Sequence, residues 1–461
     1  MLVPFVGVVH QHLKSWSLGA VLQCLDRFLD EPVFRRMMIK KPNAFTRPQG
    51  LYSLPVTVKI FLTQCLAPDH SCRTAVATAK DHAWLPPSAS PDTAAYCRAR
   101  DALTAEGLQK AVEHTAQALD AGVSDEHLWM GRQVHVVDGT GIALPDTEAN
   151  QDDYPQPSQQ KPGCGFPVLR LVAFMSLATG AVSRYRLGNL HDHEQRLFQE
   201  LRTYLKANDI VLGDRNFGTF ANLVLLKRQG AEGVFRRHQA RGSGVETLKR
   251  LGQDDSLVRW RAPHHYRPPW LDASVDLPQT IVVREVSFQV TPPGFRTQSV
   301  TLVTTLLDAK TYPAWALAEL YLRRWRMELW LRDMKITMDM DMLRTKTPSR
   351  VRAELAMFLI GYNLIRTVMF DASKVSEARL EQLSFKSALV RFGLWCVRLG
   401  HGIQLVAWLR GYAGILSDLA RDLNPERPGR YEPRVVKRRP KKFPRMQQPR
   451  QVLREKLLTA R

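Results

Sequence analysis

Four residues of the segment YLRRWRMELWLRDMK, namely Tyr321, Arg324, Glu328 and Lys335, have a spacing that would place them on one face of an α-helix. A helix turns by about 100° per residue, so these four positions fall within roughly one sixth of its circumference. A carboxylate suits Mg²⁺, and flanking cations suit phosphate oxygens. The spacing therefore predicts a surface that meets a metal-bound phosphodiester. An ordinary amphipathic surface helix is the alternative, because Arg324 and Glu328 would also form an i,i+4 ion pair.

Two aspartates elsewhere in the chain could complete such a site. Asp138 ends the apolar run QVHVVD (133–138), and Asp214 ends the run DIVLGD (209–214). Two parallel strands lying side by side would bring both carboxylates together, where they repel unless a cation neutralises them. Two metal ions about 3.5–4 Å apart on shared carboxylates catalyse in-line displacement at phosphorus. Either aspartate alone could simply cap a turn, so the metal-site hypothesis depends on both fitting one arrangement with Glu328.

The elements around these residues read as an α/β pattern with a mixed sheet. A hairpin turn at 177–180 is flanked by apolar runs with strand character. The sequence further predicts, in order, a helix at 191–206, a strand at 209–214, a helix at 219–229, a strand at 233–237, strand-like alternation within 238–300, a strand at 299–307, and helices at 312–336 and 349–370.

The first 125 residues read as helical, with leucines at helical spacing in 18–29. The segment TAAYCRARDAL predicts a helix that exposes Arg98 and Arg100. A helical module with exposed arginines could bind DNA, and a solvated helix face explains the same residues equally well.

Composition favours a polyanionic partner. The chain has 461 residues, 44% of them hydrophobic, and a formal net charge of +21. Such a charge favours nucleic acid or an anionic membrane surface, and the absence of a run of about 18 apolar residues argues against the membrane. Six scattered cysteines form no CxxC pair, which disfavours a zinc or redox motif and suggests reduced thiols. Nucleic acid is therefore the expected partner.

Three residues near the predicted hairpin, His191, His193 and Glu194, could be taken for a metal cluster. Their spacing fits no zinc motif. We interpret them as a loop or the start of a helix, close to the active site because they directly follow the hairpin. The adjacent pair His264 and His265 is interpreted as a surface feature.

Taken together, these residues resemble a known family. Tyr321, Arg324, Glu328 and Lys335 match the Y-(2)-R-(3)-E-(6)-K signature of DDE transposases from bacterial insertion sequences, specifically the IS-four family. The segments VVDGT and GDRNFG look like that family's first and second Asp motifs. The interval of 114 residues from Asp214 to Glu328 is similar to that of members with a β-strand insertion.

The resemblance implies an RNase H-like catalytic core, a mixed sheet flanked by helices, interrupted by a β-rich insertion and accompanied by helical N- and C-terminal regions. The expected organisation is a helical DNA-binding domain at 1–125, the first part of the core at 126–237, the insertion at 238–298, the second part of the core at 299–375, a helical region at 376–423 and a basic tail at 424–461.

The resemblance also implies roles for the matched residues. Asp138, Asp214 and Glu328 would be catalytic and would hold two Mg²⁺ ions, for which Mn²⁺ could substitute. DNA would be gripped by Tyr321, Arg324 and Lys335, and by the tail residues Lys437, Arg438, Arg439, Lys441 and Lys442. Some relatives form a hairpin intermediate in which a tryptophan of the insertion stacks on a flipped base, and Trp260 and Trp270 are the candidates here, although large aromatic residues more often serve packing in a core.

The implied activity is DNA cleavage at the ends of an insertion sequence and strand transfer into target DNA. The implied partners are double-stranded DNA, both terminal inverted repeats and target, and a second copy of the chain in a synaptic dimer. The bacterial cytoplasm, at the nucleoid, is the expected location. Two other readings stay open: an RNase H-like nuclease without strand transfer, and a DNA-binding protein without catalysis.

Overall fold

The computed structural model describes residues 36–40, 45, 50–239, 244–263, 267–290, 298–396, 405–425 and 444–459. They belong to two compact units, each assembled from segments that are far apart in the sequence. The first unit comprises Met1–Gln133, Ala173–Tyr185 and Arg326–Pro425, and the second comprises Val134–Val172, Arg186–Trp325 and Glu426–Arg461. The predicted helix at 18–29 and the pair His264 and His265 lie outside the described residues.

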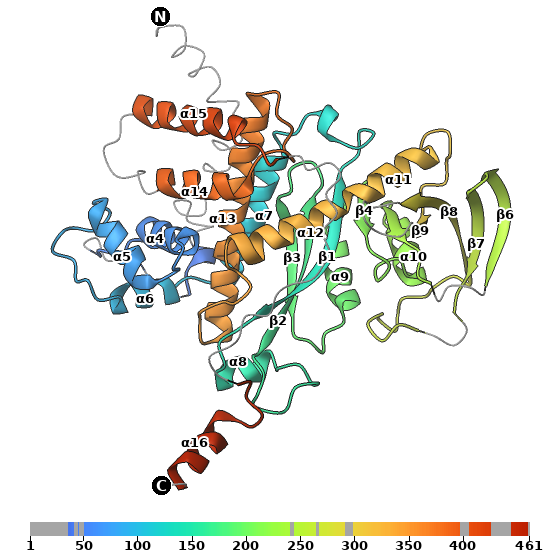
Figure 1. Cartoon of the computed structure of the whole chain (residues 1–461). Helices are drawn as coiled ribbons and strands as arrows, with labels where there is room; N and C mark the ends of the chain where they lie inside the picture. The colour runs from blue at the N-terminus through green and yellow to red at the C-terminus, as the bar shows by residue number, and fades with distance from the viewer. Residues whose placement is uncertain are drawn as a thin grey trace, which may run out of the picture. The chain divides into compact units, whose positions relative to one another are not determined.

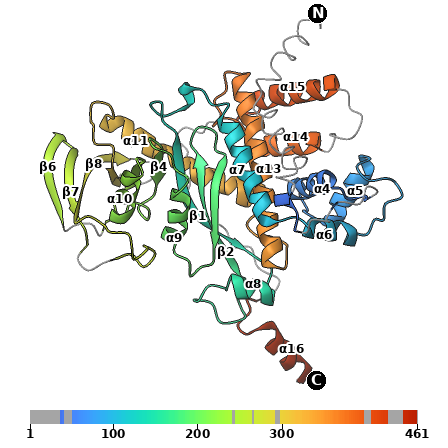
Figure 2. The ribbon, with the colours of Figure 1, turned by 180° about the vertical axis from the view of Figure 1, so that it is seen from behind.

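The first unit is mainly helical, and α13 forms its centre. α13 packs against α4, α7, α14 and α15, and α7 and α14 are seen beside it from both sides in Figures 1 and 2. The helical elements of this unit are α4 (Leu54–Leu66), α5 (Cys72–Asp81), α6 (Ala94–Asp101), α7 (Ala105–Asp120), the 3-10 turn η1 (Asp125–His127), α13 (Pro348–Lys374), α14 (Phe385–Cys396) and α15 (Leu405–Arg421).

α13 is long and apolar enough to cross a membrane by length and composition, and its most apolar window is wholly buried within the protein. Core helices of soluble proteins share both properties. Its polar residues are satisfied inside the unit. Asn363 accepts a hydrogen bond from the Val182 N–H at 2.9 Å, and its amide donates to the Val112 carbonyl at 3.2 Å. One buried side chain therefore connects α13 to α7 and to the hairpin.

The predicted hairpin is present and joins β2 (Val168–Ser176) to β3 (Val182–Gly188). Gly180 has a φ of +74°, which glycine adopts at little cost. Its N–H donates to the Ser176 carbonyl at 2.7 Å, and the Tyr362 hydroxyl of α13 donates to the Gly180 carbonyl at 3.1 Å. The turn is thus held against the central helix of its unit.

The second unit carries most of a nine-stranded mixed sheet, with the order β3-β2-β1-β4-β5-β9-β8-β7-β6 among the described residues. β1 pairs with β4 and β4 with β5 in parallel, whereas β5, β9, β8, β7 and β6 pair antiparallel. The strands are β1 (Val134–Ala143), β4 (Ile210–Gly213), β5 (Glu232–Arg236), β6 (Val245–Gly252), β7 (Asp255–Arg261), β8 (Thr280–Val290) and β9 (Gln298–Thr304). The α/β class predicted from the sequence is confirmed.

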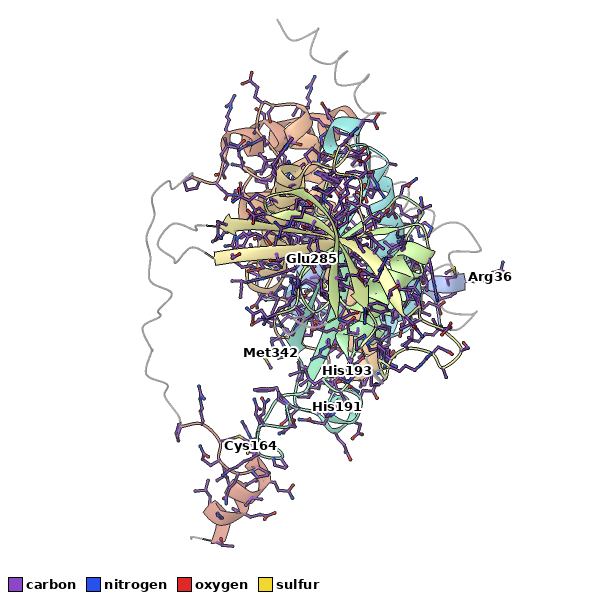
Figure 3. All side chains as sticks on the ribbon, turned by 90° about the vertical axis from the view of Figure 1, so that its right-hand side faces the viewer. Arg36, Cys164, His191, His193, Glu285 and Met342 are labelled. Atoms are coloured by element: carbon purple, nitrogen blue, oxygen red, sulfur yellow. The ribbon has the colours of Figure 1, made fainter. Side chains whose placement is uncertain are left out.

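The strands of the β-rich segment extend this same sheet. β8 pairs with β9, which in turn pairs with β5, so β6, β7 and β8 continue outward from the parallel strands. Buried side chains hold this part together. Arg284 donates to both carboxylate oxygens of Asp255, at 2.7 and 2.5 Å, and the Trp260 indole donates to Glu285 at 2.8 Å. Figure 3 shows Glu285 on the sheet.

The described residues of the second unit also form the helices α8 (Glu148–Asp153), α9 (Glu194–Arg202), α10 (Phe220–Arg228), α11 (Ala314–Arg323) and α16 (Arg450–Thr459). The segment before α16 contacts the loop after α8, because a Cβ at Gly163 would lie 2.9 Å from the Pro449 ring. Cys164, beside that contact, is labelled next to this segment in Figure 3.

The prediction of one helix at 312–336 is wrong in one respect, because this segment is not a single α-helix. α11 ends at Arg323, α12 (Trp325–Arg332) follows, and the π-helix η2 (Asp333–Thr337) completes the run. A π-helix has more residues per turn than an α-helix. The angle assigned to Lys335 from an ideal α-helix therefore does not apply, since Lys335 lies in η2.

Candidate active site

Adjacent parallel strands bring the two predicted aspartates of the second unit together. The register of β1 and β4 pairs Val134 with Ile210 and Val136 with Leu212. Continued by two residues, it places Asp138 opposite Asp214. The expectation that parallel strands unite these two carboxylates is therefore confirmed, and both strands can be followed in Figure 1.

The position of Asp138 within its strand differs from the prediction. β1 runs to Ala143, so Asp138 lies in the middle of the strand rather than at its end. The apolar run stops at Asp138 because the next residues, Gly139 and Thr140, are small or polar, yet they keep the extended backbone. Asp214 does follow the last residue of β4, as expected.

Backbone N–H groups orient both carboxylates. The Gly139 N–H donates to Asp138 Oδ1 at 2.8 Å, and the Asn216 N–H donates to Asp214 Oδ1 at 2.8 Å. The second contact is an Asx-type turn, which holds an aspartate in place without engaging its other oxygen. Each side chain is thus oriented by a backbone N–H one or two residues further along the chain.

The surroundings of Asp138 raise the pKa of its carboxyl group. Burial raises the pKa of its carboxyl to about 6, and the Gly139 hydrogen bond opposes that rise. The neighbouring Asp214 and Glu194 raise the same pKa further, while Arg324 lowers it. The Arg324 guanidinium lies 3.9 Å from Asp138 Oδ2. A second positive charge at this point would stabilise the ionised form.

Tyr321 and Arg324 join the aspartates in the same unit. Tyr321 is buried in α11, and this burial raises the pKa of its phenol, against the lowering effect of Arg324. The guanidinium carbon of Arg324 lies 5.8 Å from the centre of the Tyr321 ring. Four of the six predicted core-site residues, Asp138, Asp214, Tyr321 and Arg324, therefore gather within one unit.

Glu328 and Lys335 belong to the other unit. Glu328 lies in the first turn of α12, four residues beyond Arg324 along the chain, and Lys335 lies in η2. Both side chains are partly exposed. Their assignment to the site stays a prediction.

The loop before α9 reaches the aspartates, as its sequence position suggested. His193 is the N-cap residue of α9 and Glu194 is its first residue, so the helix-start interpretation is confirmed. The Glu194 carboxylate lies against the backbone of Gly139, where an added Cβ would be 2.8 Å from its Oε1. Figure 3 labels His191 and His193 in this loop. The sequence predicted that this segment lies near the active site but did not identify Glu194 as a neighbour of Asp138.

A cavity of about 930 Å³ opens beside this loop, within the second unit. Glu194, Arg215 and Trp270 are among its lining residues. Trp260 also borders the cavity, but it is 1% exposed and its indole donates to Glu285, which is the behaviour of a core residue. Trp270 is partly exposed.

One predicted DNA-facing arginine is buried instead. Arg100 is 8% exposed, and its guanidinium donates to Gln64 Oε1 at 3.0 Å. It lies 4.9 Å from the ring of Phe61, so it serves the packing of α4 against α6. Arg98 is exposed, as expected. Helical spacing alone does not distinguish these two positions, which are only two residues apart.

The basic tail residues Lys437, Arg438, Arg439, Lys441 and Lys442 lie outside the described residues, and their assignment stays a prediction.

The donor chemistry of the site fits a divalent cation. Asp138 and Asp214 present hard oxygen ligands side by side, and the repulsion between them disfavours two bare negative charges. Among the described residues, no three His, Cys, Asp or Glu side chains converge tightly enough to enclose an ion. Mg²⁺ requires no such cage, because it keeps several waters and uses one or two carboxylates together with substrate phosphates.

Comparison with known proteins agrees with this chemistry. Residues 129–364 match the family model of the transposase DDE domain. The transposase InsG for insertion sequence element IS4 of Escherichia coli (strain K12) is 26% identical over 362 residues, which cover 76% of this chain and 77% of that protein.

A solved structure, the piggyBac transposase synaptic complex with hairpin DNA, covers 89% of this chain and 86% of that chain at 11% identity. Its TM-score of 0.44 is too low to support an argument about this protein. The family model alone spans more than half of the chain and includes Asp138, Asp214 and Glu328. The chain is therefore a DDE transposase of the IS4 family, an enzyme that acts on DNA.

Proposed function

We propose that this transposase cleaves DNA at the ends of an insertion sequence and joins the released 3′-hydroxyls to target DNA through a two-metal mechanism. The observation that carries the proposal is the pairing of Asp138 with Asp214 on adjacent parallel strands, with Arg324 3.9 Å from Asp138. Carboxylates next to a phosphate-binding cation suit phosphoryl transfer.

An RNase H-like core is the fold that we propose for the catalytic part. The support is a mixed sheet in which parallel β1, β4 and β5 lie next to a β2–β3 hairpin. The antiparallel strands β6 to β9 would be the insertion, carried as an extension of that sheet.

Asp138, Asp214 and Glu328 would hold two divalent ions, Mg²⁺ or, as a substitute, Mn²⁺. Such ions activate an attacking water or 3′-hydroxyl and neutralise charge on the leaving oxygen. The protein would contribute the fixed orientation of the two aspartates, through the N–H groups of Gly139 and Asn216. It would also keep Asp138 in a low-dielectric place where a cation is strongly favoured.

Arg324, Tyr321 and Lys335 would contact phosphates near the transposon end. Arg324 is close enough to Asp138 to contact a phosphate that is bound at the same metal site, and its guanidinium lies over the Tyr321 ring. An arginine suits this position because its planar fork binds two phosphate oxygens at once.

If this enzyme uses a hairpin intermediate, Trp270 would be the tryptophan that stacks on the flipped base. It lines the cavity beside Glu194, whereas Trp260 is buried and bound to Glu285. Stacking on an aromatic ring offsets part of the cost of flipping a base.

The proposed partners are terminal inverted repeats, target DNA and a second copy of the chain, because two ends must be held together. The helical region at 376–423, which contains α14 and α15, is our proposal for the dimer contact. The basic tail, including Lys437 to Lys442, would bind phosphates. The bacterial nucleoid would be the site of action.

A cleavage and joining assay with the element's own end sequences tests the proposal. The wild type is compared with Asp138→Ala, Asp214→Ala and Glu328→Ala in Mg²⁺ and in Mn²⁺. Each substitution should lower the cleavage rate by at least about 10³-fold, since removing a metal carboxylate forfeits several kcal/mol of transition-state stabilisation. End binding in a gel-shift assay should remain. Glu200→Gln, on the exposed side of α9, is the control.

The products separate the alternatives. Cleavage with joining of 3′-hydroxyls supports the transposase mechanism, and cleavage without joining identifies a nuclease. End binding without metal-dependent cleavage by the wild type would leave a DNA-binding protein. Normal cleavage by one alanine variant would remove that residue from the triad.

A further inference from the structure

Glu194 reaches the catalytic aspartates although it lies outside the four-residue signature and both Asp motifs. Its Oε1 would be 2.8 Å, and its Cδ 3.1 Å, from a Cβ built on Gly139. Real Cβ atoms do not come so close to another atom. The absence of a side chain at Gly139 is therefore what allows the Glu194 carboxylate to occupy that space.

The peptide that Glu194 touches is the same one that orients Asp138. The Gly139 N–H donates to Asp138 Oδ1 at 2.8 Å. The Glu194 carboxylate and the Asp138 side chain therefore both lie against the Gly139 residue. Glu194 also acts on Asp138 as a neighbouring negative charge.

The start of α9 is fixed on its other side to the second Asp motif. The side-chain amide of Gln195 donates to the carbonyl of Asn216, two residues after Asp214. The Asn222 amide donates to Gln195 Oε1 at 2.6 Å. The first turn of α9 thus contacts β1 at Gly139 and the loop that follows Asp214, so Glu194 lies next to the segments of both aspartates.

An arginine lies close to the Glu194 carboxylate, as one does to the Asp138 carboxylate. Arg170 Nε lies 4.0 Å from Glu194 Oε1, and Arg324 Nη1 lies 3.9 Å from Asp138 Oδ2. The carboxylates of Asp138, Asp214 and Glu194 therefore lie in one region of the second unit together with nearby guanidinium groups.

A simpler explanation for Glu194 is stabilisation of α9. An acidic residue in the first turn interacts favourably with the helix dipole. This effect needs no contact with Gly139, so it leaves the position of the carboxylate unexplained. It also predicts no influence on metal affinity, which separates the two explanations experimentally.

We propose that Glu194 is a positioning residue of the metal site, which holds the Asp138–Gly139 peptide and adds negative charge that strengthens divalent-cation binding. The inference rests on the proposed metal site at Asp138 and Asp214. Side chains that support metal ligands in this way typically alter metal affinity by about 10- to 100-fold.

Mn²⁺ binding to the full-length protein tests this without DNA cleavage. Free Mn²⁺ is measured by electron paramagnetic resonance during titration of the wild type, Glu194→Gln, Asp138→Asn and the control Glu200→Gln. Glu200 lies on the same helix, 47% exposed and paired with Arg186, so its substitution removes an equal charge. Circular dichroism confirms that each variant is folded.

We expect Glu194→Gln to weaken Mn²⁺ binding by roughly 10-fold or more, and Glu200→Gln to leave it within about twofold. Equal Mn²⁺ affinity for Glu194→Gln and the wild type overturns the inference. Asp138→Asn reports on the underlying site: if it too binds Mn²⁺ normally, the proposed metal site itself fails, and the inference with it.

A double-mutant cycle tests the route through Gly139. Gly139→Ala should displace the Glu194 carboxylate and weaken Mn²⁺ binding about as much as Glu194→Ala does. The double variant Gly139→Ala with Glu194→Ala should be no weaker than Glu194→Ala alone, because the steric conflict has been removed. Fully additive losses, or no loss in Gly139→Ala, would contradict the proposed contact.

Discussion

At the scale of single residues, the burial of Asp138 costs the metal-free protein stability at neutral pH. Its carboxyl is buried next to another carboxylate, and the nearby guanidinium of Arg324 opposes the resulting rise in its pKa. A group whose pKa is raised by burial gains a proton on folding at intermediate pH. In the metal-free protein, ionised Asp138 therefore lowers the free energy of unfolding.

This cost predicts that Asp138→Asn stabilises the metal-free transposase at neutral pH. The pKa of Asp138 is about 6 in the folded protein against 3.8 as the ordinary value. The folded state therefore binds the proton more tightly, and the free energy of unfolding falls as pH rises from about 4 to about 6. Asparagine keeps the Gly139 hydrogen bond without the charge. We expect a gain of about 1–3 kcal/mol at pH 7 in chelator, measured by urea unfolding.

The same variant should give no gain at pH 4, where Asp138 is protonated in the folded state. Glu200→Gln serves as the control for the loss of one carboxylate from the surface. A gain of equal size at pH 4 and pH 7 would contradict the electrostatic origin, and destabilisation at pH 7 would contradict the burial of a charge.

Sequence reasoning at this scale succeeded where a residue directly follows a recognisable apolar strand. Asp214 after an apolar strand and the pairing of Asp138 with it were predicted correctly. The burial of Arg100 was not, because helical spacing does not reveal that Gln64 of another helix provides a buried acceptor. The contact of Glu194 with Gly139 depends on how α9 is docked, which no local pattern encodes.

At the scale of elements, the β2–β3 hairpin depends on glycine at its turn. Gly180 has φ +74°, and a Cβ there would lie 2.7 Å from the Arg366 guanidinium. Arg366 also donates to the Thr179 carbonyl at 2.8 Å, and this hydrogen bond would be lost if its side chain moved away. The turn can therefore accept neither the backbone strain nor the added volume of another residue.

We expect Gly180→Ala to lower the free energy of unfolding by about 1–3 kcal/mol. Gly393→Ala is the matched control, because Gly393 lies within helix α14 and a Cβ there would meet no atom within 4 Å. It should stabilise by about 0.5–1 kcal/mol. Thermal unfolding monitored by circular dichroism measures both, and equal signs would contradict the argument.

The ends of the helices and strands show where the periodicity of apolar residues no longer predicts secondary structure. The hairpin, β4, α10 and α13 were predicted closely, because apolar runs and turn residues mark their ends. The continuation of β1 past Asp138 was missed, since Gly139 and Thr140 resemble a loop. The π-helix at Lys335 has no local signature, because an extra residue per turn is selected by packing rather than by helix propensity.

At the scale of the whole molecule, charge is concentrated at the C-terminal end. From Glu426 onward the chain has 13 Lys and Arg against three Glu, so this segment supplies +10 of the net +21. Binding through such a segment releases counterions from DNA and is sensitive to salt.

Replacing Lys437, Arg438, Arg439, Lys441 and Lys442 with glutamine should therefore weaken DNA binding most at low salt. The slope of log binding constant against log salt concentration should become shallower by about 4.5 units if all five contact phosphates. Fluorescence anisotropy with specific and unrelated duplexes measures the effect, which should be similar for both. Arg438→Lys with Arg439→Lys keeps the charge and should keep the slope.

The division into two units could not be foreseen from the sequence. The expected organisation followed the order of segments along the chain, whereas each unit combines segments separated by more than a hundred residues. Strand and helix signals are local, but compactness arises from contacts between distant segments such as α7 and α13. The functions assigned to the six segments expected from the sequence stay predictions, and the segments do not correspond to the two compact units.

The parallel pairing of β1 with β4 also has a consequence for how the protein comes into being. Parallel neighbours need a long connection, and here the β2–β3 hairpin and α9 supply it over the 76 residues between Asp138 and Asp214. Non-local pairings of this kind form late and slowly. A ribosome must therefore release both strands before the two aspartates can meet, and Glu328 emerges 114 residues later still. Because the proposed metal site also uses Glu328, a nascent or prematurely terminated chain that ends before residue 328 would lack one of the three carboxylates.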